Sequence, residues 1–196
     1  MNKIKSTYEL IEKIIAIILV DKNRDPSFAD FREGLKKCLI YPTDDLYLDE
    51  EQFIALDKAM NEKRYYVMQF EEIDQIYNQG NCIFEFSSYE DYKRVYDEYE
   101  KNIDEYRASG ASEFNMYYFW SKTILFSESL DWILQITEAD DGGIGLLGGK
   151  KEKITRFMEL YGRCNDDLLN CEKHFENRGM DIYSLSPALM DLNDNL

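Results

Sequence analysis

Trp132-Ile-Leu-Gln-Ile-Thr137 and Ile144-Gly-Leu-Leu147 are two short apolar runs separated by the acidic and glycine residues of Glu138–Gly143. Each run is rich in strand formers, and the residues between them are typical of a tight turn. We therefore predict a β-hairpin. Further runs of strand-forming residues indicate other strands at Arg64–Phe70, Cys82–Phe86, Tyr117–Trp120 and Thr123–Phe126.

Helical patterns lie on both sides of these strands. Ser6 with Glu9, and Asp49 with Gln52, have the spacing of a capping box, while Asp25-Pro26 is typical of a helix start. We predict an α+β fold in a single domain, residues 1–196. It has a mostly helical N-terminal part, a small antiparallel sheet in the middle, and a long C-terminal helix packed on the sheet. The predicted helices begin near Ser6, run from Asp25 to before Pro42, from Asp49 to about Lys63, from Ser88 to about Arg107 and from about Lys151 to Asn177, with a short helical turn at Glu71–Asn78.

The composition is that of an acidic, folding chain. Of its 196 residues, 44% are hydrophobic and 14% aromatic, and the formal net charge is −16. This charge repels nucleic acid and anionic membranes and favours encounter with basic partners, although acidity also serves solubility alone. The longest apolar stretch, Ile14–Val20, is too short to span a bilayer. We expect a cytoplasmic protein that binds neither membranes nor nucleic acid directly.

The predicted helix at Ser88–Arg107 carries the most distinctive pattern. Tyrosines repeat along one stripe of it, and acidic residues repeat every seven positions beside that stripe. Because seven residues make nearly two helical turns, the six carboxylates form a double column on one side of the helix. The tyrosines include Tyr89, Tyr92 and Tyr99, and the columns are Glu90, Asp97 and Asp104 beside Asp91, Glu98 and Glu105.

This pattern has a structural and a functional interpretation. In the structural one, the acids form a solvated face and the tyrosines pack beneath it. In the functional one, the acids form a rigid surface for a basic partner, and the tyrosines at its border contribute contact area at low entropic cost. The acidic runs Asp44-Asp45, Asp49-Glu50-Glu51, Glu71-Glu72 and Asp166-Asp167 extend this surface or lie elsewhere, which the sequence does not decide.

Two glycine motifs resemble ligand sites but do not meet the requirements of those sites. Gly143, Gly145 and Gly148 match a dinucleotide-binding fingerprint, but the span between them, Ile144–Leu147, is a predicted strand, and two aspartates that would repel phosphate precede the glycines. Gly148-Gly149-Lys150 lacks the residues of a phosphate-binding loop around it. We therefore predict neither a cofactor nor a catalytic residue, although carboxylates holding magnesium remain an alternative.

The cysteines are few and scattered, which favours reduced thiols over disulfides. Cys164 and Cys171 belong to an apolar stripe that continues along the predicted C-terminal helix, so we expect both thiols to be buried. Together with His174, the only histidine, they lack the paired spacing of a zinc site. We therefore predict no metal site.

One segment resembles a known family. Ile124-Leu-Phe-Ser-Glu-Ser-Leu-Asp-Trp132, the following strand, and Ile144-Gly-Leu-Leu-Gly148 before a helix are similar to the C-terminal part of small acidic immunity proteins. Those proteins protect bacteria from polymorphic or contact-dependent toxins. The resemblance covers residues 123–158 and implies an antitoxin that blocks the active site of its toxin. It implies structural roles for Trp132 and the glycines, and assigns no binding residues.

The resulting hypothesis is an acidic protein inhibitor of the immunity-protein type, and not an enzyme. Its partner would be a basic toxin nuclease or nucleic-acid-binding effector, and the Ser88–Arg107 helix would bind it. A phage counter-defence protein that imitates the charge of DNA, such as an anti-restriction or anti-CRISPR factor, uses the same electrostatics and is the first alternative. A carboxylate-metal enzyme is the second.

Overall fold

The computed structural model describes residues 2–19, 29–44, 47–70, 76–80, 82–95, 97, 122–139 and 142–181. Its helices are α1 (Tyr8–Ile15), α2 (Glu50–Met60), α4 (Lys151–Tyr161) and α5 (Cys164–Asn177), with a further helical segment at residues 89–95. Its strands are β1 (Asn2–Lys5), β2 (Ile18–Leu19), β3 (Asp30–Phe31), β4 (Lys36–Thr43), β5 (Tyr65–Phe70), β6 (Cys82–Phe86), β7 (Lys122–Ser127), β8 (Trp132–Ala139) and β9 (Gly142–Gly149).

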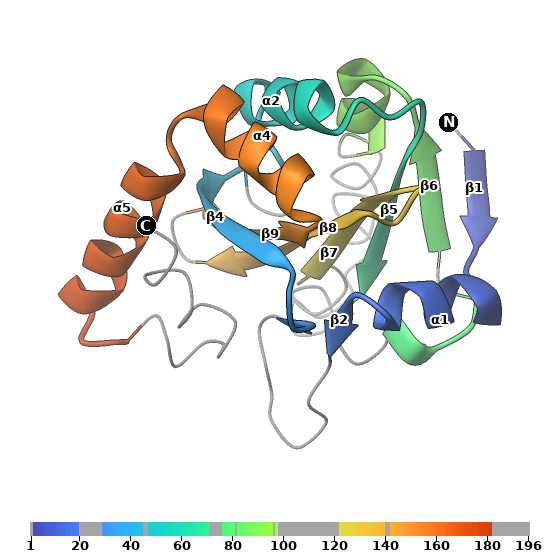
Figure 1. The fold of residues 1–196 in the computed structure, drawn as a ribbon, viewed down its shortest axis with the longest axis horizontal. Coiled ribbons are helices and arrows are strands. Elements are labelled where there is room, and N and C mark those ends of the chain that lie inside the picture. The colour runs from blue at the N-terminus through green and yellow to red at the C-terminus, as the bar shows by residue number, and fades with distance from the viewer. Residues whose placement is uncertain are drawn as a thin grey trace, which may run out of the picture.

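Seven of these strands form one antiparallel sheet in the order β1-β6-β5-β7-β8-β9-β4 (Figure 1). Strands β2 and β3 pair separately. The α+β class is therefore confirmed. The predicted arrangement is wrong, because strands occur early in the chain and the sheet extends from β1 to β9. It is the main element of the fold, not a small insert between helices.

Both faces of the sheet are covered. Helices α2 and α4 lie along one side and α1 lies on the other, while α5 packs beside the edge strand β4 (Figure 1). Neighbouring residues of β8 point to opposite faces of the sheet. Leu134 packs with the α2 and α4 core, and Ile133 packs with the core of α1 and α5. This burial on two sides gives several strands continuous apolar runs.

The predicted hairpin is confirmed as β8 and β9, with Leu134 opposite Leu147. Its glycines allow close packing: a Cβ on Gly148 would overlap the ring of Phe31, and one on Gly149 would overlap the backbone at Asp131 and Trp132. The predicted strand Ile144–Leu147 is thus confirmed, and β9 extends beyond it to include all three glycines of the motif. The strands predicted around Arg64–Phe70, Cys82–Phe86 and Thr123–Phe126 are also confirmed, whereas Tyr117–Trp120 lies outside the described residues.

The helix predicted between Asp25 and Pro42 is wrong in its described part. The chain forms β3 there, turns at Gly34 with φ +83°, and continues as β4. Within β4, Cys38–Tyr41 is buried at every position. Any continuous apolar run includes residues that are three or four positions apart, which is also the spacing of a helix face. The spacing of the apolar residues therefore did not distinguish a helix from a buried strand.

The first helix is shorter than its apolar residues predict. It occupies Tyr8–Ile15, and its cap is Thr7, whose hydroxyl accepts a hydrogen bond from the N–H of Leu10. Ser6 is therefore not the cap. Ile18 belongs to β2, where it pairs with Phe31.

The helix predicted from Asp49 is confirmed as α2, including the capping box of Asp49 and Gln52. It ends at Met60, earlier than predicted, because Asn61 adopts a left-handed conformation with φ 52°.

The predicted C-terminal helix is two helices. Gly162, with φ +70°, ends α4, and α5 begins at Cys164. The predicted apolar stripe is divided accordingly. Its first part packs with the α2 and α4 core, and its second part packs on the other side of the sheet with Ile133. The first part is Ile154, Phe157, Tyr161 and Cys164, and the second is Leu168, Cys171 and Phe175.

Among the described residues, no helix combines the length and the apolar character needed to cross a bilayer.

Candidate partner-binding surface

The helical segment 89–95 is fixed to the loop before α2 by an aromatic cluster. Its first turn is capped by Ser88, whose hydroxyl accepts a 3.2 Å hydrogen bond from the N–H of Asp91. Tyr92 is buried and stacks on Phe53 of α2, with ring centroids 5.1 Å apart. Its hydroxyl accepts a 3.0 Å hydrogen bond from the N–H of Leu48. The segment is therefore held in a defined position relative to α2.

Tyr89 lies at the outer border of this cluster. Its half-buried ring lies 5.6 Å from that of Phe53 and 6.5 Å from that of Tyr92, between centroids. Burial raises the pKa of Tyr89, and so do nearby carboxylates from three segments of the chain. They are Glu50, Asp49, Asp44 and Glu90, in decreasing order of effect. We call Tyr89 with these four acids the Tyr89 surface.

The acids of this surface differ in what else they do. The Asp49 carboxylate caps α2 by accepting a 2.8 Å hydrogen bond from the N–H of Gln52. Asp44, Glu50 and Glu90 are exposed and form no ion pair with a lysine or arginine in the described part of the chain. At its margins, Glu51 is 3.5 Å from Arg163 and Asp91 is 3.1 Å from Arg94. Three of the four acids near Tyr89 are thus exposed and available to a basic partner.

The structure places only part of the predicted double column. Glu90 and Asp97 are exposed, whereas Asp91 is half-buried and paired with Arg94. Tyr92, predicted as a possible anchor for a partner, is only 1% exposed and therefore belongs to the core. The remaining candidates, Tyr99, Glu98, Asp104 and Glu105, lie outside the described residues.

The sequence pattern did not identify the acids near Tyr89 that belong to other segments of the chain. Asp44 and Glu50 belong to acidic runs that were visible in the sequence, but their position next to Tyr89 depends on the pairing of β4 and on the packing of Phe53. A helical pattern reports neighbours only within its own helix.

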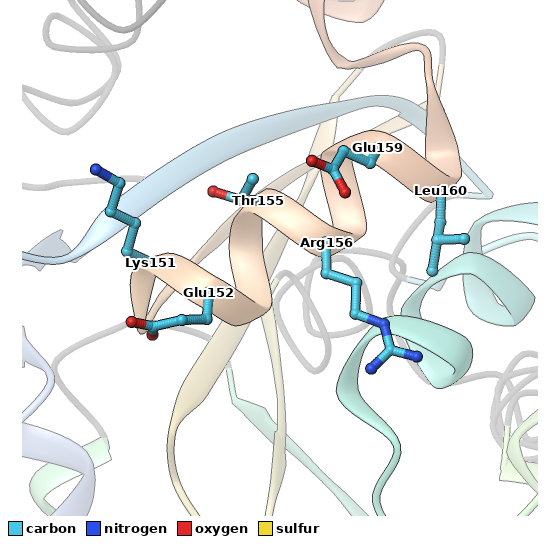
Figure 2. Close-up of a pocket in the computed structure, with 6 residues that line it drawn as sticks. All are labelled: Lys151, Glu152, Thr155, Arg156, Glu159 and Leu160. Atoms are coloured by element: carbon cyan, nitrogen blue, oxygen red, sulfur yellow. The ribbon is translucent and has the colours of Figure 1, made fainter.

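A different, shallow groove of about 640 Å³ lies on the outer face of α4. Lys151, Thr155 and Glu159 project from one side of the helix, and Arg156 and Leu160 from the other (Figure 2). Its two basic residues and two acidic residues, Glu152 and Glu159, balance in charge. This groove therefore offers no electrostatic preference for a basic partner, in contrast with the Tyr89 surface.

The thiols and the histidine occupy structural positions. Cys38, Cys164 and Cys171 are buried free thiols. The ring of His174 lies 5.9 Å from that of Tyr41 and 5.4 Å from that of Phe175, between centroids. Over the ranges that the structure describes, no three residues of the types His, Cys, Asp and Glu are grouped so that they could hold a metal ion.

Comparison of the chain with models of protein families, with curated proteins and with solved structures finds no match.

Proposed function

We propose that this protein is an acidic inhibitor of the immunity-protein type, which binds and occludes a basic, nucleic-acid-handling surface of a toxin. The observation that carries the proposal is that Tyr89 packs against Phe53, one helical turn from Asp49 and Glu50, and that these acids together with Asp44 and Glu90 raise the pKa of its hydroxyl. Like charges held close together repel one another, and a positively charged partner relieves that repulsion on binding. The toxin class rests on the resemblance of residues 123–158 to immunity proteins.

The Tyr89 surface has the features of a protein-binding site. A tyrosine ring offers a large, stiff contact area, and the exposed carboxylates around it can each pair with arginine or lysine. The ring is fixed by Phe53 and Tyr92, so little side-chain entropy is lost on binding. Asp97, seven residues after Glu90, is also exposed and adds to the negative charge of this segment.

The first experiment measures binding of a defined basic probe. The variant Asp44→Lys/Glu50→Lys/Glu90→Lys reverses three exposed acids of the Tyr89 surface and leaves the Asp49 cap intact. The matched control, Glu33→Lys/Glu159→Lys/Glu176→Lys, makes the same change in net charge at exposed positions elsewhere. Fluorescence anisotropy with an oligoarginine peptide should give a dissociation constant at least about tenfold higher for the first variant than for the control, a difference of about 1.4 kcal/mol.

The second experiment tests inhibition directly. Purified protein is added to a panel of bacterial nuclease toxins with basic substrate grooves, and nuclease activity is measured. We expect the wild-type protein and the control variant to inhibit one of them in a 1:1 complex, and the Tyr89-surface variant to lose that inhibition. An equal loss in both variants would show that net charge alone matters, and would contradict the proposal.

A further inference from the structure

A second cavity lies on the opposite face of the sheet, between α1 and the turn that joins β7 to β8. Its volume is about 250 Å³. Its apolar walls are Leu10 of α1, Tyr66 of β5, Phe126 of β7 and Leu130 of the turn. This is smaller than most ligand pockets, so it suits a molecule of about one ring.

The aromatic part of the wall is well defined. The rings of Tyr66 and Phe126 stack with centroids 5.6 Å apart and an interplanar angle of 23°. Phe126 is buried and Tyr66 is half-buried, so the ring of Tyr66 separates the core from the open side of the cavity. A flat apolar group can lie against this pair, as in aromatic contacts within protein cores.

Leu130 completes the wall from an unusual backbone conformation. Its φ is +49°, in the left-handed region that a leucine rarely adopts, and its N–H donates a 3.1 Å hydrogen bond to the carbonyl of Ser127. Glycine or asparagine would be favoured there on backbone grounds alone. The leucine side chain instead packs at the edge of the core and lines the cavity, as Leu10 does.

The charges at the mouth leave one carboxylate without a partner. Glu9 and Lys13 both line the cavity, and their ion pair of 2.7 Å cancels their charges. Glu128 is exposed at the turn and pairs with no lysine or arginine in the part of the chain described. Burial raises the pKa of Tyr66, as do Glu85 and then Glu128, whereas Arg64, which is 3.6 Å from Glu85, opposes these effects. The Glu128 carboxylate therefore lies within electrostatic reach of the tyrosine.

We infer that this cavity binds a small organic cation, consisting of an apolar or aromatic body that ends in one ammonium group. The body would lie against Tyr66, Phe126 and the two leucines, and the ammonium group would pair with Glu128. A cation near an aromatic ring gains further from the negative potential of the ring face. An anion of the same shape would be repelled by Glu128 and by the net charge of −16.

The test is a titration with three probes of similar shape: 2-phenylethylammonium, neutral 2-phenylethanol and anionic phenylacetate. Chemical-shift changes in the backbone amide spectrum report both affinity and location. We expect the cation to bind at least about tenfold more tightly than either analogue, with the largest shifts at Leu10, Ser127 and Leu130. Equal binding of the cation and the neutral probe, shifts confined to other regions, or no shifts at millimolar concentration would overturn the inference.

Two variants locate the interaction. Glu128→Gln removes the unpaired charge at an exposed position, so the fold is retained and the preference for the cation should disappear. The control Glu159→Gln removes an exposed carboxylate on α4, outside this cavity, and should leave the preference unchanged. If both variants weaken cation binding to the same extent, the effect comes from the overall charge and the assignment to Glu128 is wrong. The result is independent of the Tyr89 surface, which contains neither glutamate.

Discussion

The hydroxyl of Tyr161 donates a 2.8 Å hydrogen bond to Oδ2 of Asp167, at the junction of α4 and α5. The same oxygen accepts a 3.0 Å hydrogen bond from the N–H of Tyr41 in β4. The other oxygen, Oδ1, has no hydrogen-bond partner and lies 3.7 Å from Arg163. One fully buried carboxylate thus connects the end of α4, the start of α5 and the edge of the sheet.

This arrangement predicts a pH-dependent stability. Burial raises the pKa of Asp167, and the hydrogen bonds from Tyr41 and Tyr161 oppose that rise only in part. The folded state therefore binds the proton more tightly than the unfolded state, so the contribution of Asp167 to stability falls as pH rises from the ordinary aspartate pKa through the raised one. The variant Asp167→Asn cannot titrate. In urea unfolding at several pH values, the wild type should lose stability relative to this variant as pH increases.

Two controls make that result specific. Asp166→Asn changes the exposed neighbour and retains Asp167, so this variant should lose stability relative to Asp167→Asn as pH increases, as the wild type does. Asp167→Ala leaves the N–H of Tyr41 without its buried acceptor, so it should destabilise the protein at every pH by about 1–3 kcal/mol. A wild type whose stability relative to Asp167→Asn rises with pH would contradict the predicted direction of the shift.

The hydroxyl of Tyr92 gives a second prediction. Tyr92→Phe keeps the ring in contact with Phe53 but removes the acceptor of the Leu48 N–H, which then remains buried without a partner. We expect a loss of about 1–3 kcal/mol in the free energy of unfolding. Tyr89→Phe is the matched control and should cost less than about 0.5 kcal/mol, because that ring lies at the surface. Similar costs for both variants would show that the hydrogen bond to Leu48 contributes nothing.

The contact of Gly148 with Phe31 gives a third. Gly148→Ala places a methyl group on the ring of Phe31, so we expect a loss of about 1–3 kcal/mol in chemical denaturation. Phe31→Leu provides space for that methyl group, and the cost of Gly148→Ala should be smaller in its presence. A double-mutant cycle measures this coupling. If the stability losses of the two substitutions simply add, the cost of Gly148→Ala does not arise from its contact with Phe31.

The thiol of Cys171 gives a fourth. Burial raises its pKa to about 12, with smaller contributions from Glu172 and Asp167. At pH 8 only about one thiol in ten thousand would then be ionised, and the thiolate is the reactive species. Iodoacetamide labelling followed by peptide mass spectrometry should modify Cys171 only after the protein is unfolded in urea. Glutathione in the same solution is the control for reagent activity, and labelling of native Cys171 at a comparable rate would refute the prediction.

The sequence predicted those elements whose signals are local. The capping box of Asp49 and Gln52 and the pairing of the two hairpin strands depend on residues close in sequence, and both were correct, although the strands extend to Ala139 and from Gly142, further than predicted. At β4 a helix was predicted instead of a strand. Because β4 is buried on both faces, its apolar residues are consecutive and do not show the alternation of apolar and polar residues that marks a half-exposed strand.

In the candidate site, too, the sequence identified residues close together in the chain but not those brought together by the fold. Glu90 and Tyr89 could be found from their helix, whereas Asp44 and Glu50 required the fold. The division of the C-terminal stripe at Gly162 likewise depended on the chain crossing from one side of the sheet to the other beside β4.

The position of β4 has a consequence for synthesis of the chain. Its only neighbour in the seven-stranded sheet is β9, and residues 44–141 separate the two strands. On the ribosome, the apolar segment Cys38–Tyr41 therefore emerges long before the strand that will cover its backbone groups. Until β9 has been synthesised, the backbone groups of this apolar segment have no strand partner, and exposed apolar segments of this kind are prone to aggregation.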